Sequence, residues 1–252
     1  MNLLKIIKNI AKIIKEKNFF YDKNFSKFSI KDYIYYKKLN YEIISLGAYC
    51  LPRVATTAAK LKPKKMYGAK TYPFDLCFHF NIKKITECID NNFINYFDNL
   101  SYDKDNFCWV NKNIDAVYNH NTNLTKNKFI KKYKKRIKNF QKSLKTNKKI
   151  YFIYSYIWED NFPTSLDIDN LFNALKKRRG NRKFELILII SQEIKDIKNE
   201  NIHQIIINGF NIADPVWVKD FFNTENGGII KIDKNQYYYL IIKQALKTMI
   251  KE

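Results

Sequence analysis

Two uninterrupted apolar runs in the second half of the chain constrain the fold most. Residues 150–156 (IYFIYSY) and 184–190 (FELILII) show almost no alternation of polar and apolar side chains, which is typical of strands buried on both faces. A helical pattern at 165–179 lies between them, and YEIISLG at 41–47 predicts another buried strand. Buried strands that alternate with helices indicate a mainly parallel sheet that is covered on both sides.

We therefore predict an α/β fold with a single three-layer α/β/α domain over residues 41–252. Another strand is expected at 203–207 and a closing amphipathic helix at 237–250. An N-terminal helical extension is expected at 1–40, and a helix-rich insertion at about 80–147.

Inside the insertion, the spacing of apolar residues predicts further elements. Helices are expected at 81–90, 92–97 and 125–145, and short strands at 107–110 and 114–118. The helix at 125–145 has one apolar stripe and one basic face, the latter made of Lys128, Lys131, Lys132, Lys135, Arg136, Lys138 and Lys142. That face is either solvated or holds phosphate or lipid headgroups.

The net charge of +22 invites comparison with nucleic-acid-binding proteins. Nearly all of this charge is lysine, however, and proteins that read phosphate and guanine specifically rely on the planar fork of arginine. Lys, Asn and Ile are abundant together, so we interpret the positive charge as lysine spread over the whole surface of the protein. Nucleic acid is therefore not the expected partner.

The N-terminal residues 1–18 alternate isoleucine and leucine with lysine at helical spacing. Such a helix either lies on an anionic membrane surface or packs on the domain or on a second subunit. No run approaches the roughly 18 apolar residues of a membrane span. We expect a cytoplasmic protein, peripheral to the inner membrane if the first interpretation holds.

Metal and cofactor motifs are missing from the sequence. The four cysteines form no CxxC pair, and neither a P-loop nor GxGxxG occurs. We expect no metal and no cofactor, and free thiols in a reducing compartment.

In a parallel sheet, ligands bind beyond the carboxyl ends of the strands. Residues 47–50 and 191–193 follow two of the predicted strands. Gly47 permits a sharp turn and the close approach of a ligand, and Arg53 lies one helical turn after Cys50. We predict substrate-binding roles for Gly47, Arg53, Ser191 and Glu193.

Cys50 lies between a predicted strand and a helix whose first turn contains Pro52. The unpaired N–H groups of a helix N-terminus favour a thiolate, which makes Cys50 a candidate nucleophile. The alternative is a small buried side chain that fills a gap under the helix.

A nucleophilic thiol needs an imidazole and a group that orients it. Of the three histidines, His203 opens a core strand and His79 lies in an aromatic segment, so both have structural explanations. His120 lies in a polar turn before the basic helix. Asp75, which has apolar neighbours in sequence, either orients His120 or caps a backbone turn.

Three motifs resemble a bacterial family of unknown function that is labelled papain-like cysteine peptidase. They are ISLGAYC at 44–50, YPFD at 72–75, and His120 followed by FIKKYKKRIKNF. The chain differs from the family pattern in having Leu76 where a tryptophan is usual, and lysines in place of paired arginines. The resemblance covers about residues 41–155. It implies catalytic roles for Cys50, Asp75 and His120, and a place in surface-polysaccharide metabolism.

The sequence thus predicts a cysteine-dependent hydrolase or an acyl or glycosyl transferase that acts on a small molecule or glycan. Cys50 would be the nucleophile, His120 the general base and Asp75 its orienting group, with backbone N–H groups around 48–51 as oxyanion donors. Two alternatives stay open. One is a non-covalent glycan-assembly transferase that binds a phosphate-bearing donor, and the other is a non-catalytic module for anionic membrane or nucleic acid.

Overall fold

The computed structural model describes residues 29–48, 50–64, 67–79, 81–156, 162–207 and 234–250, with the side chains of the last segment described from 241 on. The chain divides into two compact units, Met1–Leu39 with Pro63–Ala69 and Asn40–Lys62 with Lys70–Glu252. The amphipathic segment 1–18 lies outside the described residues.

The first unit contains helix α2, Ile30–Lys38. Ser29 caps this helix, because its side chain accepts a hydrogen bond from the Asp32 N–H. The Tyr67 hydroxyl accepts from the Ser29 N–H at 3.1 Å and donates to Asp32 at 3.4 Å. Tyr67 therefore ties the second segment of this unit to the start of α2.

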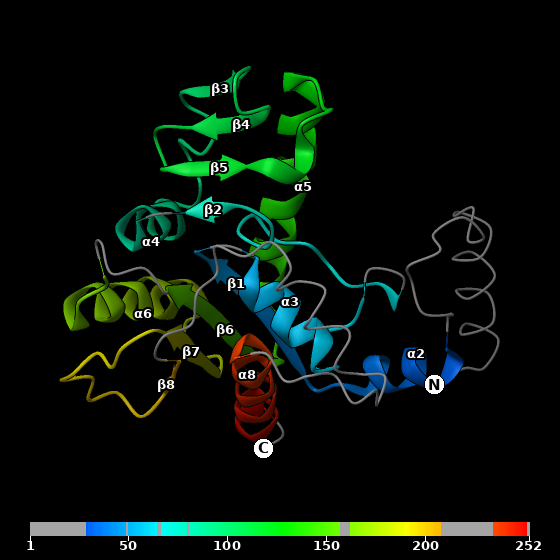
Figure 1. Ribbon diagram of the computed structural model, residues 1–252, viewed down its shortest axis with the longest axis vertical. Coiled ribbons are helices and arrows are strands. Elements are labelled where there is room, and N and C mark those ends of the chain that lie inside the picture. The colour runs from blue at the N-terminus through cyan, green and yellow to red at the C-terminus, as the bar shows by residue number, and fades with distance from the viewer. Residues whose placement is uncertain are drawn as a thin grey trace. The chain divides into compact units, whose positions relative to one another are not determined.

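The second unit is built on a parallel sheet (Figure 1). Its strands are β1 (Tyr41–Gly47), β6 (Lys149–Tyr156), β7 (Phe184–Ile190) and β8 (Ile202–Ile206), in the order β1-β6-β7-β8. All neighbouring strands run parallel. The predicted α/β fold is confirmed, and each of the four predicted strands lies within one residue of its expected position.

Helices cover both faces of this sheet. They are α3 (Leu51–Ala58), α4 (Ile82–Asp90), α5 (Lys126–Leu144), α6 (Ser165–Arg179) and α8 (Lys234–Ile250). Ring contacts place α5 and α6 on one face, since Phe140 lies 6.3 Å from Phe152 and Phe172 lies 4.7 Å from Phe184. Helix α3 contacts β1, β6 and α8.

The opposite face carries Tyr41 and Tyr151, whose rings lie 5.7 Å apart. The Tyr41 hydroxyl donates to the Leu61 carbonyl just beyond α3, at 3.3 Å, so α3 covers this face. Thr164 caps α6 through a reciprocal pair of bonds with Asp167. None of the helices in the described segments is long and apolar enough to cross a membrane.

A second, antiparallel sheet forms between α3 and α5 in the chain (Figure 1). Its strands are β2 (Phe78–His79), β3 (Leu100–Asp103), β4 (Cys108–Asn111) and β5 (Ala116–Tyr118), in the order β2-β5-β4-β3. The predicted strands at 107–110 and 114–118 are confirmed as β4 and β5. Strand β2 lies at the end of segment 72–79, which the sequence allows as either an aromatic loop or a short strand, and β3 was not predicted.

The helix predicted at 92–97 is wrong. Residues 91–99 form turns, because Asn92 and Phe93 adopt positive φ angles of 60° and 65°, which a right-handed helix excludes. The helix predicted at 81–90 is confirmed as α4, with Asn81 as its cap.

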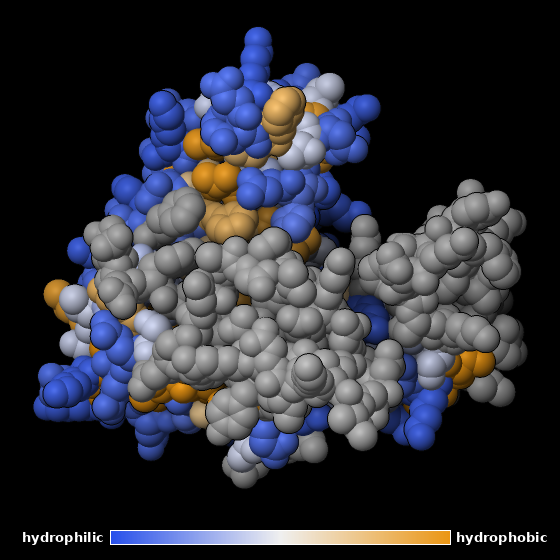
Figure 2. Space-filling model, in the orientation of Figure 1, coloured by the Kyte–Doolittle hydropathy of each residue, from blue (hydrophilic) through white to orange (hydrophobic). Residues whose placement is uncertain are grey.

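Aromatic rings hold the antiparallel sheet against α5. Phe129 of α5 lies 5.0 Å from Tyr118 and 5.3 Å from Trp109, measured between ring centroids. Figure 2 shows mainly hydrophilic residues on the visible surface of this part of the unit. The second sheet thus has its own apolar contacts with a helix that also packs on the parallel sheet.

Candidate functional site

The turn after β1 is held from both sides. The Ala48 N–H donates to the Ser155 carbonyl of β6 at 2.7 Å, and the Ala48 carbonyl accepts from the His79 N–H of β2 at 2.6 Å. The Ser155 hydroxyl donates to the Gly47 carbonyl at 3.2 Å. The two sheets therefore meet at the carboxyl end of β1.

Gly47 ends β1 with a φ of +98°. A Cβ atom at this position would lie 3.7 Å from Ile85 and 3.8 Å from His79, which are ordinary contacts. Glycine is therefore required by the backbone conformation, not by a lack of space.

Cys50 occupies the N-cap position of α3, and its carbonyl accepts the Val54 N–H at 2.9 Å. Of the four cysteines, only Cys50 is partly exposed, while Cys77, Cys88 and Cys108 are buried. Burial raises the pKa of the Cys50 thiol to about 11, opposed in part by a hydrogen bond with its own backbone. The expected preference for thiolate at the helix N-terminus is thus outweighed by desolvation.

The pKa of the Cys77 thiol responds to Cys50 and to two charged side chains, Arg136 and Asp75. Burial raises the pKa of Cys77, Arg136 lowers it, and Asp75 and Cys50 raise it further. The Cys77 sulfur also donates to the Pro73 carbonyl at 3.4 Å. The thiol pair, Asp75 and Arg136 therefore share one neighbourhood.

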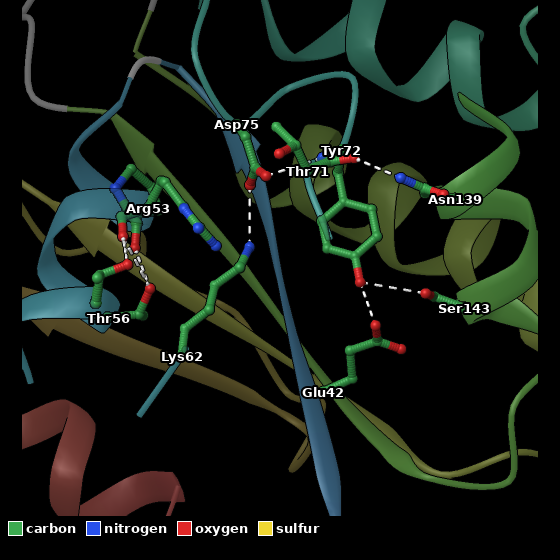
Figure 3. Close-up of polar contacts among 11 residues, drawn as sticks. Glu42, Arg53, Thr56, Lys62, Thr71, Tyr72, Asp75, Asn139 and Ser143 are labelled. Carbon is green, nitrogen blue, oxygen red and sulfur yellow. Dashed lines mark hydrogen bonds and ion pairs between the residues drawn. The ribbon is translucent and has the colours of Figure 1, made fainter. Parts of the chain in front are cut away.

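Asp75 is fully buried. One carboxylate oxygen lies 3.1 Å from the Lys62 ammonium, and the other accepts the Tyr72 N–H at 2.8 Å (Figure 3). Asp75 thus caps a backbone turn, which was one of the two roles predicted for it. Its contacts in the described part of the chain do not include His120.

Lys62 was not singled out by any sequence motif, yet it is only 4% exposed. Its ammonium lies 4.8 Å from the centre of the Tyr72 ring. Burial lowers the pKa of Lys62 to about 8, Asp75 opposes this shift and Arg53 adds to it. The Arg53 side chain extends toward Lys62 and Asp75 in Figure 3, so the predicted substrate-binding arginine lies beside a buried ion pair.

His120 lies in a short 3₁₀ helix, Asn119–Asn121, directly after β5. Its side chain is exposed. Partial desolvation lowers the pKa of His120, and the charges of Arg136 and Lys132 on α5 lower it further. His120 is therefore mainly neutral at pH 7, as a general base must be.

His79 is fully buried at the junction of the two sheets. Its ring lies 5.0 Å from that of Phe74 in an edge-on contact. Within the described segments, neither ring nitrogen makes a hydrogen bond of normal geometry. Burial lowers the pKa of His79 to about 4, opposed in part by the backbone of Ile114.

Ser191 and Glu193 follow β7 at the same end of the parallel sheet as Cys50. Strand β6 lies between β7 and β1, the strand that precedes Cys50. Ser191 is half-buried and Glu193 is exposed. His203 lies in β8, and its ring nitrogen is 3.2 Å from the Glu185 carboxylate. In the described ranges, no group of three His, Cys, Asp or Glu side chains is placed to hold a metal ion.

Arg136 was predicted on the exposed basic face of α5, and this prediction is wrong. Arg136 is only 6% exposed, because it lies on the same side of the helix as Tyr133 and Phe140. Its guanidinium carbon lies 4.4 Å from the centre of the Tyr133 ring.

One protein family matches this chain. The family model described as "Putative papain-like cysteine peptidase (DUF1796)" matches residues 41–193. The matched span begins with β1 and ends just after β7, so it contains the turn that carries Cys50. No curated protein and no solved structure matches the chain. With more than half of its residues matched, the chain belongs to this family of papain-like cysteine peptidases.

Proposed function

We propose that this protein is a cysteine-dependent hydrolase, or a group transferase of the same chemistry, with Cys50 as the nucleophile. One observation supports this most directly. Cys50 is the partly exposed thiol among four cysteines, and it lies at the start of α3 beyond the carboxyl end of β1. Ligands of parallel sheets bind at that end.

The raised pKa of Cys50, about 11, means that the resting thiol is protonated at pH 7. A base must therefore take the proton as the sulfur attacks the substrate. We assign this role to His120, because it is exposed and its lowered pKa keeps the imidazole neutral. The sulfur forms a bond to the substrate carbon, and the proton goes to the imidazole and then to the leaving group. Water, or an acceptor in a transferase, releases the covalent intermediate.

The oxyanion donors in this proposal come from the first turn of α3. The Ala48 N–H already donates to Ser155, so it does not serve. Leu51 lies in the first helical turn, where an N–H group has no acceptor within the helix. Asp75 holds the YPFD turn in this scheme, and its contacts support that role over orienting His120.

Alkylation by iodoacetamide at pH 7, followed by mass spectrometry of each cysteine, tests the proposal. We expect Cys50 to react at least about tenfold faster than Cys77, Cys88 and Cys108, because among the four cysteines only Cys50 is partly exposed. His120→Ala should remove most of this advantage. His79→Phe is the matched control, since that ring is buried.

Equal rates at all four cysteines would contradict the proposal. If His79→Phe, and not His120→Ala, removed the faster alkylation of Cys50, the base would be His79 at the junction of the two sheets. Activity retained by Cys50→Ser would favour the non-covalent glycan-assembly transferase. A place in surface-polysaccharide metabolism stays a prediction from the resemblance.

A further inference from the structure

Arg136 is a buried cation for which the described part of the chain supplies no anion. It is 6% exposed, and no ion pair joins it to a described carboxylate. Its Nη1 atom is fully buried without a hydrogen-bond acceptor there. The Tyr133 ring lies 4.4 Å away in a cation–π contact, and the Tyr133 side chain also forms a hydrogen bond with Arg136. Burial of an arginine in this state is costly.

A second buried arginine has acceptors for both of its terminal nitrogens, although its Nε has none in the described segments. Arg179, at the end of α6, is 0% exposed. Its two terminal nitrogens donate to five backbone carbonyls at 2.8 to 3.4 Å, those of Ser143, Leu144, Thr146, Lys148 and Lys183. Both arginines lie on amphipathic helices that pack on the same face of the parallel sheet. The difference between the two arginines is that a terminal nitrogen of Arg136, one of the pair that faces a planar ligand, has no acceptor, whereas both terminal nitrogens of Arg179 have acceptors.

The position of Arg136 relates it to the candidate site. It lies one turn before Phe140, whose ring contacts Phe152 in β6. Helix α5 runs antiparallel to β6, because its last residues meet the start of β6 through Arg179. Arg136 therefore lies toward the carboxyl end of β6, which is the end where Cys50 lies.

The electrostatic neighbours of Arg136 agree with this placement. Its charge lowers the pKa of His120 and that of Cys77, and Cys77 in turn responds to Cys50. One turn earlier on α5, Lys132 donates to Asn121, the residue after His120. The charge of Arg136 thus acts both on the candidate base and on Cys77.

We propose that Arg136 binds an oxyanion group of the substrate, a carboxylate or a phosphate, next to the bond that Cys50 attacks. The planar fork of a guanidinium matches both groups through two parallel hydrogen bonds. A ligand anion would provide the acceptor that Nη1 lacks. The proposal rests on the proposed function for its location beside the reacting sulfur, but the binding of an anion by Arg136 is testable on its own.

Two alkylating reagents of nearly equal size, iodoacetate and iodoacetamide, differ in that only the first carries a carboxylate. We expect Arg136→Gln to lower the rate of Cys50 alkylation by iodoacetate about tenfold relative to iodoacetamide, the effect of one lost charge-assisted hydrogen bond. Arg136→Lys should fall between the two proteins. Lys135→Gln, which removes an exposed charge from the same turn, is the control and should leave the ratio unchanged.

Calorimetric titration provides a readout that does not need a reactive thiol. Inorganic phosphate and acetate are each titrated into the unsubstituted protein, Arg136→Gln and Lys135→Gln. Saturable binding of either anion that Arg136→Gln alone abolishes supports the proposal, and the anion that binds identifies the group.

Anion binding that is absent from the unsubstituted protein, or equal in all three proteins, overturns the proposal. So does a reagent ratio that Arg136→Gln and Lys135→Gln change alike. If Cys50 reacts no faster than the other cysteines but phosphate or acetate binding depends on Arg136, the proposed function fails and the anion site stands. Arg136→Lys serves both assays if the glutamine variant does not fold.

Discussion

The two ends of the parallel sheet treat buried polar groups differently. At the amino end, Arg179 bonds the carbonyls that precede β6 and β7 and those at the end of α5. Toward the carboxyl end, the imidazole of His79 and the hydroxyl of Tyr154 are buried and make no hydrogen bond of normal geometry in the described ranges. Arg136 belongs with this second group.

We interpret this difference as a division between an end of the sheet that contributes stability and an end that is available for binding. Natural proteins satisfy nearly all buried polar atoms, so a concentration of unsatisfied ones calls for an explanation. The amino end fastens the helices to the sheet through both terminal nitrogens of Arg179, although its Nε has no acceptor in the described segments. Under the proposed function, the unsatisfied groups toward the carboxyl end would be available to a substrate.

The largest expected effect is that of Arg179→Met. Five hydrogen bonds to backbone carbonyls are lost, and at about 1 kcal/mol for each bond the free energy of unfolding should fall by about 5 kcal/mol. Urea denaturation measures this loss. Lys176→Met, on the exposed side of the same helix, is the control.

Arg136→Met should lower the free energy of unfolding by less than about 1 kcal/mol, or raise it. The reason is that the substitution removes a buried charge that has no described counter-ion. Equal losses for the two arginine variants would break the comparison between the two ends of the sheet.

The next effect in size is that of Lys62→Met, which leaves the Asp75 carboxylate buried without its cation. Removing one partner of a buried ion pair costs about 3–5 kcal/mol. The double variant Lys62→Met with Asp75→Asn should recover part of this loss, since the amide carries no charge and its oxygen still accepts the Tyr72 N–H. Chemical denaturation of Lys62→Met, of Asp75→Asn and of the double variant measures the coupling between the two residues. Losses that simply add would show that the pair does not interact.

His79 provides an effect at the lower end of the range expected for Lys62→Met, and it depends on pH. Its pKa is about 4 in the folded protein and 6.5 when unperturbed, so the unfolded chain binds the proton first as pH falls. The contribution of the neutral ring to stability is complete above pH 6.5 and declines down to pH 4, by about 3 kcal/mol in all.

In His79→Phe, the free energy of unfolding should decline less steeply between pH 6.5 and 4 than in the unsubstituted protein. Denaturation curves at several pH values measure the slope, and His203→Phe controls for the loss of a half-exposed histidine. An unchanged slope would show that His79 is not the buried group that titrates.

The parallel sheet was predictable because each strand carries its own signal. The run at 184–190 is apolar on both faces and became β7 without a change of boundary. Thr164 and Asp167 mark the start of α6 through local chemistry alone. Such signals depend on residues close together in the sequence.

The antiparallel sheet was less predictable. Strand β2 has two residues, too few for any alternation to appear. The turn at 91–99 carries apolar residues at helical spacing, but the positive φ angles of Asn92 and Phe93 are set by packing. Local pattern therefore predicts a helix that the tertiary structure excludes.

The candidate site also has a part that was predictable from local sequence and a part that was not. The location of Cys50 between a strand and the start of a helix was predictable. The pairing of Asp75 with Lys62 and the burial of Arg136 depend on contacts that bring separate parts of the chain together. In a sequence this rich in lysine, no spacing distinguishes a buried cation from a solvated one.

The hydrogen bonds of Ala48 have a consequence for how the position of Cys50 is set. The turn before Cys50 is bonded to β6 through the Ala48 N–H and to β2 through the Ala48 carbonyl. Insertions or deletions in the antiparallel sheet that displace β2 would shift this turn while the parallel sheet stays intact. Under the proposed function, a substitution in the second sheet would then alter substrate choice without replacing Cys50 or its neighbours in sequence.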